Sequence, residues 1–119
     1  MENSIFKILT VNEWKKAKKN KTILTKRDLN DGYIHLSTSK QLPLTLSLYF
    51  KKYNEVFILQ IDKKEISENL KYENNVSSKR KSKFPHYFGT LSTKNIIKSW
   101  CIKRNGFKIP DKILLFNES

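Results

Sequence analysis

The chain has 119 residues, of which 38% are hydrophobic and 12% aromatic. This size and composition predict a single domain, residues 1–119, with one hydrophobic core and no room for a second. The longest apolar run, residues 56–59, has the length of a β-strand and is far too short to cross a membrane. Because no basic start followed by an apolar core opens the sequence, we expect a cytoplasmic protein without a membrane partner.

The chain is strongly basic, with 24 Lys and Arg residues against 11 Asp and Glu and a formal net charge of +13. Such an excess favours anionic partners, including RNA and nucleotides. The lysines are scattered, however, and cluster only near residues 15–19 and 79–83. A solvated surface of purely compositional origin therefore explains the charge as well as nucleic-acid binding does, and both interpretations stay open.

Several classes of chemistry are disfavoured by what the sequence lacks. Cys101 is the single cysteine, which excludes an internal disulfide and a cysteine-based zinc site, and its apolar neighbours predict a small buried side chain. The two histidines lack the spacing of the usual metal motifs, so we expect no metal. The three glycines stand far apart, at positions 32, 89 and 106, and form neither a phosphate-binding loop nor a nucleophile elbow.

In the first half of the chain, periodicity and capping signals alternate. Residues 5–9 predict a strand, and Thr10 with Glu13 has the spacing of a capping box for a helix that ends near Asn20. The polar residues 21–31 are expected to form a loop that leads into a strand over residues 33–36. A second capping-box spacing at residues 38–41 precedes apolar residues at helical intervals, which predict a helix to about Tyr53, with its aromatic stripe in the core.

In the second half, residues 55–61 predict the central strand of a sheet, because residues 56–59 are apolar without alternation. Asp62 starts a short helix that ends near Leu70, and residues 70–73 form a further strand. A basic loop is expected over residues 74–83, a capped turn at Ser92 and a strand over residues 97–103. Residues 105–106, Asn-Gly, predict a hairpin with residues 107–109. The sum is an α+β domain with a mixed twisted sheet and two or three helices.

Two segments, residues 32–37 and 84–89, contain the two histidines, His35 and His86, each framed by aromatic and apolar residues. Burial and neighbouring groups can tune a side chain that already titrates near neutrality, so the pair is the best candidate site. The alternative is that each histidine lies at the edge of the core and bonds one backbone partner. With two such segments in one small domain, the two interpretations are about evenly matched.

We expect a cleft that contains His35, Ser37, His86 and Tyr87, with Glu73 nearby. Histidine and serine can bond ribose hydroxyls or phosphates, a tyrosine ring can stack on a heterocycle, and basic residues neutralise phosphate charge. These groups suit a nucleotide or a sugar phosphate. Glu73 is a candidate base or ribose ligand, with a surface ion pair to Lys71 as its alternative.

At these residues the chain resembles a family of small bacterial proteins, the domain-of-unknown-function family 952. The resemblance covers nearly the whole chain and rests on residues 5–10 with Trp14, residues 31–38, Gln41, residues 49–50, residues 72–73 and residues 84–89. The family usually has Phe at the position of Tyr33 and Tyr at that of Phe88. Its motif layout is similar to that of the ADP-ribosyltransferases, especially the RNA 2′-phosphotransferase branch, which carries a comparable His-Leu-Ser segment.

This resemblance implies a split, half-barrel-like sheet with a cleft that holds NAD, and a transfer of ADP-ribose or of a phosphoryl group. It implies that His35 and Ser37 lie beside the nicotinamide ribose. For a transferase we also expect Tyr33 and Tyr87 to help to bind the cofactor. His35, His86 and Glu73 would be the catalytic residues, with His86 as acid, base or phosphate ligand.

One departure from the transferase pattern keeps a second function open. The strand that usually supplies a His-Gly pair for the nicotinamide end has Lys7 and Ile8 here. The alternative is therefore a non-catalytic module that binds a nucleotide or RNA.

Overall fold

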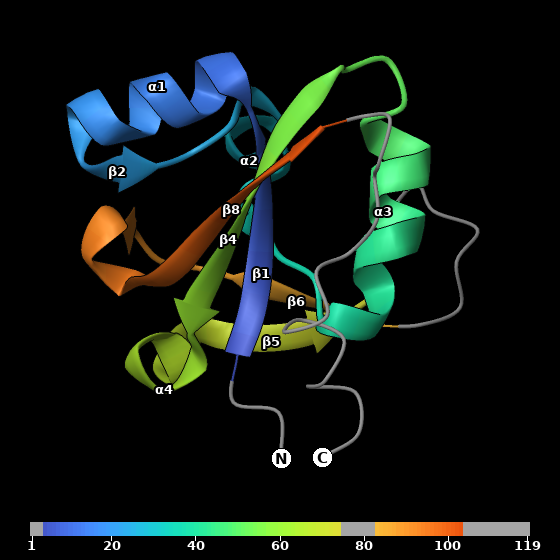
Figure 1. Ribbon diagram of the computed structural model, residues 1–119. Coiled ribbons are helices and arrows are strands. Elements are labelled where there is room, and N and C mark those ends of the chain that lie inside the picture. Colours follow the sequence, from blue (N-terminus) through green and yellow to red (C-terminus); the bar gives the residue numbers. More distant parts are fainter. Residues whose placement is uncertain (1–3, 75–82, 104–119) are drawn as a thin grey trace.

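A three-stranded antiparallel sheet forms the centre of the computed structural model, which describes residues 4–74 and 83–103. Its strands are β1 (Ser4–Thr10), β4 (Glu55–Asp62) and β8 (Ile96–Lys103), in the order β1-β4-β8 (Figure 1). The apolar run in β4 therefore marks the middle strand of this sheet, as predicted, because β4 pairs with a neighbour on each edge.

The central sheet separates two clusters of buried side chains, and Figure 1 shows a helix on either side of it. Side chains alternate along β1, so Ile5 and Leu9 pack toward α1 (Val11–Asn20), whereas Phe6 and Ile8 pack toward α3 (Leu42–Tyr49). The capping box of Thr10 and Glu13 that starts α1 is confirmed. The helix α3 ends at Tyr49, before the predicted end near residue 53.

A second three-stranded sheet lies beside the first. Its strands are β3 (Ile34–His35), β5 (Leu70–Glu73) and β6 (Phe84–Tyr87), in the order β3-β6-β5. Backbone bonds of 2.8 Å in each direction join Phe6 and Ser37, and this isolated bridge links the two sheets. Among the described residues, β1 and β3 share no further ladder, so the two strands diverge from this point.

The prediction that residues 21–31 form a loop is wrong. This segment contains β2 (Thr22–Ile23), which pairs with β7 (Leu91–Ser92), and the helix α2 (Lys26–Asp31). A capping box starts α2: the amide of Asp28 donates to Thr25 Oγ1 at 3.1 Å, and the amide of Thr25 donates to Asp28 Oδ2 at 3.0 Å. The polar composition that suggested a loop is therefore that of a short, capped helix.

The α+β class is confirmed, with two changes of detail. All strand pairings among the described residues are antiparallel, in place of the mixed sheet expected. The same part of the chain has four α-helices, including α4 (Lys63–Ile66), against the two or three expected. No helix in residues 4–74 and 83–103 is long and apolar enough to cross a membrane.

The C-terminal part of the described chain corrects one further expectation. Cys101 is exposed, because edge strand β8 turns it to the side opposite the buried Ile102. The predicted hairpin at residues 105–106 and nearly all of the basic loop at 74–83 lie outside the described residues.

Candidate functional site

A cavity of about 200 Å³ opens where β1 and β3 diverge. One part of its wall is aromatic and comes from the end of α3 and the residues after it, namely Tyr49, Phe50 and Tyr53. Another part is polar and comes from β1, α2 and the β3 region, with the residues Lys7, Thr25, Arg27, Asp28, His35 and Ser37. The cavity therefore presents flat rings and charged or hydroxyl groups to the same space.

A buried ion pair forms the floor of the polar wall. Lys7 Nζ lies 2.9 Å from Asp28 Oδ1 and 2.8 Å from Oδ2, and it donates to the carbonyl oxygen of His35 at 2.9 Å. Both charged side chains are almost fully buried. An isolated charge would be very costly here, so each group depends on its partner and on the surrounding hydrogen bonds.

The pKa values of Lys7 and Asp28 both depart from their usual values, and the geometry of the pair explains why. Burial lowers the pKa of Lys7, and the carboxylate of Asp28 offsets only part of this effect. Burial alone would raise the pKa of Asp28, but the Lys7 ammonium and the hydrogen bonds from His35 and Lys7 outweigh it and hold that pKa well below its usual range. Asp28 is therefore a fixed negative charge at the edge of the cavity.

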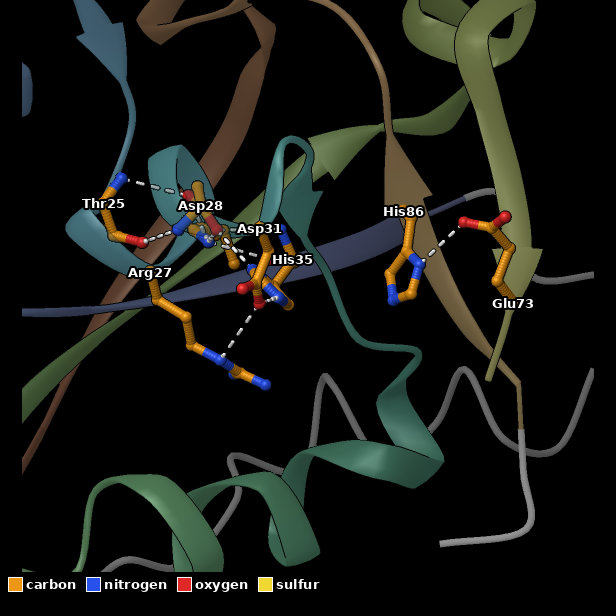
Figure 2. Close-up of polar contacts among 8 residues, drawn as sticks. Thr25, Arg27, Asp28, Asp31, His35, Glu73 and His86 are labelled. Carbon is orange, nitrogen blue, oxygen red and sulfur yellow. Dashed lines mark hydrogen bonds and ion pairs between the residues drawn. The ribbon is translucent and has the colours of Figure 1, made fainter. Parts of the chain in front are cut away.

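His35 is held between two carboxylates (Figure 2). Its Nδ1 lies 2.7 Å from Asp28 Oδ1, and its Nε2 lies 2.8 Å from Asp31 Oδ2. The His35 amide also donates to Asp28 Oδ1 at 3.0 Å. Both ring contacts are hydrogen bonds at once only when both nitrogens carry a proton. The ring is thus fixed in orientation at the cavity wall, with Nε2 on its more exposed side.

Ser37 also lines the cavity, as His35 does. Its Oγ lies 3.3 Å from Thr45 Oγ1 on α3, and Thr45 Oγ1 donates to the carbonyl oxygen of Gln41 at 3.0 Å. Two hydroxyl groups from different elements therefore meet across the cavity, near the bridge that joins the sheets.

The second histidine lies in a separate part of the site. His86 is directly opposite His35 in the β3–β6 register, and its Nδ1 lies 3.0 Å from Glu73 Oε1 (Figure 2). The Tyr33 ring stacks on His86 with 4.0 Å between centroids and lies 4.7 Å from the His35 ring. The two histidine rings are 5.9 Å apart, so the sequence motifs do converge.

The position of His86 changes its expected role. Its side chain is only 1% exposed, and neither His86 nor Tyr33 lines the cavity. A direct part as acid, base or phosphate ligand therefore does not fit this arrangement. The His86 ring instead stacks on the Tyr33 ring. Its Nδ1 contacts the carboxylate of Glu73, whose side chain is 45% exposed.

Tyr87 does not belong to the cavity either. It follows His86 on β6, so its side chain lies on the opposite face of the strand and packs against the core on the α1 side. Its ring lies so close to Gly89 that a Cβ there would be 2.7 Å from it. The expectation that Tyr87 binds the ligand is thus replaced by a packing role.

Burial of His86 predicts a pH dependence of stability. Burial lowers the pKa of His86 below 6.5, more than the hydrogen bond and charge of Glu73 raise it. The unfolded chain then binds a proton that the folded chain resists, so the unfolding free energy falls as the pH drops from 6.5 through the folded-state pKa. Denaturation of the wild type and of His86→Asn over about pH 8 to 5 tests this. A variant with the same slope as the wild type in this window would contradict it.

The sequence interpretation missed four residues of the site: Lys7, Arg27, Asp28 and Asp31. Two signals were present. A lysine stands in the middle of the apolar strand at residues 5–9, and Thr25 and Asp28 have the three-residue spacing of a capping box. Neither signal says that the two segments meet, because this depends on how β1 and α2 pack.

With this geometry described, the comparisons with known proteins define the family. The model of the family described as "Protein of unknown function (DUF952)" matches residues 8–99, well over half of the chain. The chain belongs to the DUF952 family. The expected family membership is thereby confirmed.

Solved structures show the same fold. The DUF952 chain is similar to the crystal structure of protein CC0527 from Caulobacter crescentus, with a TM-score of 0.78 and 26% identity over 93% of this chain and 98% of that one. The solution NMR structure of CC0527 gives a TM-score of 0.74 and 27% identity over 95% and 98% of the two chains. The search of curated proteins gave no match.

Proposed function

We propose that this domain has an ADP-ribosyltransferase-like fold, binds NAD or a related nucleotide in the cavity, and transfers ADP-ribose. The split between the two sheets supports the proposal, because β1 and β3 are bridged at Phe6 and Ser37 and then separate around a cavity. A cleft in a split sheet is what the sequence resemblance to the transferases implies.

The observation that carries the proposal is the two-sided lining of the cavity. Tyr49, Phe50 and Tyr53 provide aromatic surface on which a heterocycle can stack. Ser37 and His35 provide hydroxyl and ring-nitrogen groups that can bond a ribose. A volume of about 200 Å³ suits one heterocycle with its ribose, so the rest of a dinucleotide would extend through the opening.

The reaction that suits this site breaks the bond between nicotinamide and C1′ of the ribose. Nicotinamide leaves with the electron pair of that bond, and a nucleophile of the acceptor then bonds C1′ of the ADP-ribosyl group. Positive charge develops on the ribose beside His35, whose ring is held by the Asp28 carboxylate through Nδ1. In this scheme His35 orients the ribose through Nε2, where a ribose hydroxyl competes with Asp31.

Glu73 and His86 take supporting roles in the same scheme. Glu73 is the exposed carboxylate at the far side of Tyr33 and is the candidate base for the acceptor. His86 bonds Glu73 and stacks on Tyr33, so it acts as a positioning residue for both.

Release of nicotinamide from NAD, followed by chromatography, tests the reaction. We expect slow release by the wild type and a reduction of about a hundredfold in His35→Ala, since loss of correct positioning can cost about that much. Lys26→Gln serves as the matched control, because it changes an exposed side chain of α2 that does not line the cavity.

Binding of NAD without release would favour the non-catalytic alternative. The observation behind that alternative is Lys7, whose ammonium is committed to Asp28 and the His35 carbonyl at the position where the transferases carry a His-Gly pair. Salt-sensitive binding of RNA together with no binding of NAD would instead favour an RNA-binding module.

A further inference from the structure

We infer that Arg27 is the phosphate-recognition residue of the cavity and selects a ligand with a phosphate group over the same nucleoside without one. This inference rests on the proposed function, since it names the part of the nucleotide that Arg27 contacts. It adds a specificity residue that neither the sequence motifs nor the family description points to.

The guanidinium of Arg27 is held in place before any ligand arrives. Its central carbon lies 4.1 Å from the centroid of the Tyr49 ring, and both residues line the cavity. The stack joins α2 to the end of α3. This contact restrains the guanidinium at the cavity wall, and the fork of N–H donors of an arginine can bind phosphate oxygens in pairs.

The N–H edge of Arg27 is also accessible. The side chain is 39% exposed, and its ion pair with Asp31 is a long one, with 3.9 Å between Nε and Oδ2, which is beyond hydrogen-bond distance (Figure 2). Lys7, the other basic side chain of the cavity wall in the described part of the chain, is buried and has its ammonium against Asp28 and His35. Of these two cations, Arg27 is the one placed to meet an anion from solvent.

A phosphate on Arg27 leaves the rest of the site intact. It would displace the long contact to Asp31, whereas the contact of 2.7 Å between His35 Nδ1 and Asp28 Oδ1 is unaffected. The fixed orientation of His35 is thus independent of the anion. Arg27 and His35 would then contact different parts of one ligand, the phosphate and the ribose.

Two probes that differ only by a phosphate test the inference: nicotinamide mononucleotide and nicotinamide riboside, titrated by calorimetry at low salt. We expect the wild type to bind the mononucleotide at least about tenfold more tightly, since bonds to a charged group are the strong ones. Arg27→Gln should remove this preference and leave the affinity for the riboside unchanged, and Arg27→Lys should restore part of it. Lys26→Gln is the matched control, because it removes an exposed charge from the same helix outside the cavity.

The outcomes separate the inference from the proposed function. Equal binding of the two probes by the wild type, or a preference that survives in Arg27→Gln, overturns the inference alone. An equal loss in Lys26→Gln also overturns it, because net charge would then explain the effect. If neither probe binds, the proposed function fails. A titration with inorganic pyrophosphate then tests whether Arg27 recognises phosphate. Binding of pyrophosphate that Arg27→Gln abolishes supports this role, and no binding by the wild type overturns it.

Discussion

Replacement of Asp28 by asparagine is expected to lower the free energy of unfolding by about 3–5 kcal/mol, the cost typical of breaking a buried ion pair. The change preserves the shape of the side chain but leaves the buried Lys7 ammonium without its counter-charge. It also weakens the bonds to the ring and the amide of His35, which both use Oδ1. Urea denaturation of the wild type and of Asp28→Asn at neutral pH measures the difference.

Two further variants make this prediction specific. Asp31→Asn removes a carboxylate that is 41% exposed and also contacts His35, so its cost should stay below about 1 kcal/mol. Lys7→Met combined with Asp28→Asn should recover part of the lost stability, because no unpaired charge is then buried. An Asp28→Asn protein as stable as the wild type would show that the pair does not hold β1 and α2 together.

The parts of the fold that the sequence predicted are those with local causes. The capping box of Thr10 and Glu13 starts α1, because both partners lie within one turn of helix. The apolar run in β4 indicates a central strand, because every face and edge of that strand is covered. Where a local signal was present but not used, at Thr25 and Asp28, the helix α2 was taken for a loop.

The site depends on contacts that no local pattern describes. Lys7 and Asp28 are 21 residues apart, and they meet only because the fold brings the side chain of Asp28 on α2 to that of Lys7 on β1. His35 and His86 face each other because β3 pairs with β6 in a particular register, and the sequence does not specify which strands pair. The motifs thus identified the histidines but not the carboxylates that hold them.

The error on Tyr87 has a simpler physical origin. The sequence interpretation placed both His86 and Tyr87 in the cleft, but adjacent residues of a strand point to opposite faces of the sheet. Once His86 contacts Tyr33, its neighbour must face the core. The alternation of side chains along a strand, applied to residues 84–87, would have placed His86 and Tyr87 on opposite faces of the sheet.

The second large effect is expected from filling the cavity. Thr45 lines it from α3, so a phenyl ring in Thr45→Phe would occupy space that the proposal gives to the nicotinamide ribose. We expect the affinity for NAD to fall by about 100-fold or more, equivalent to about 2.8 kcal/mol. Leu48→Phe adds a ring to an exposed position of the same helix, outside the cavity, and should bind NAD as the wild type does. Circular dichroism of both variants shows whether the fold is preserved.

Calorimetric titration of NAD at low salt, into the wild type, Thr45→Phe and Leu48→Phe, tests most directly whether this cavity is a nucleotide site. The proposal predicts saturable binding by the wild type and Leu48→Phe that is lost in a folded Thr45→Phe. No binding by the wild type, or equal binding by all three proteins, would contradict it.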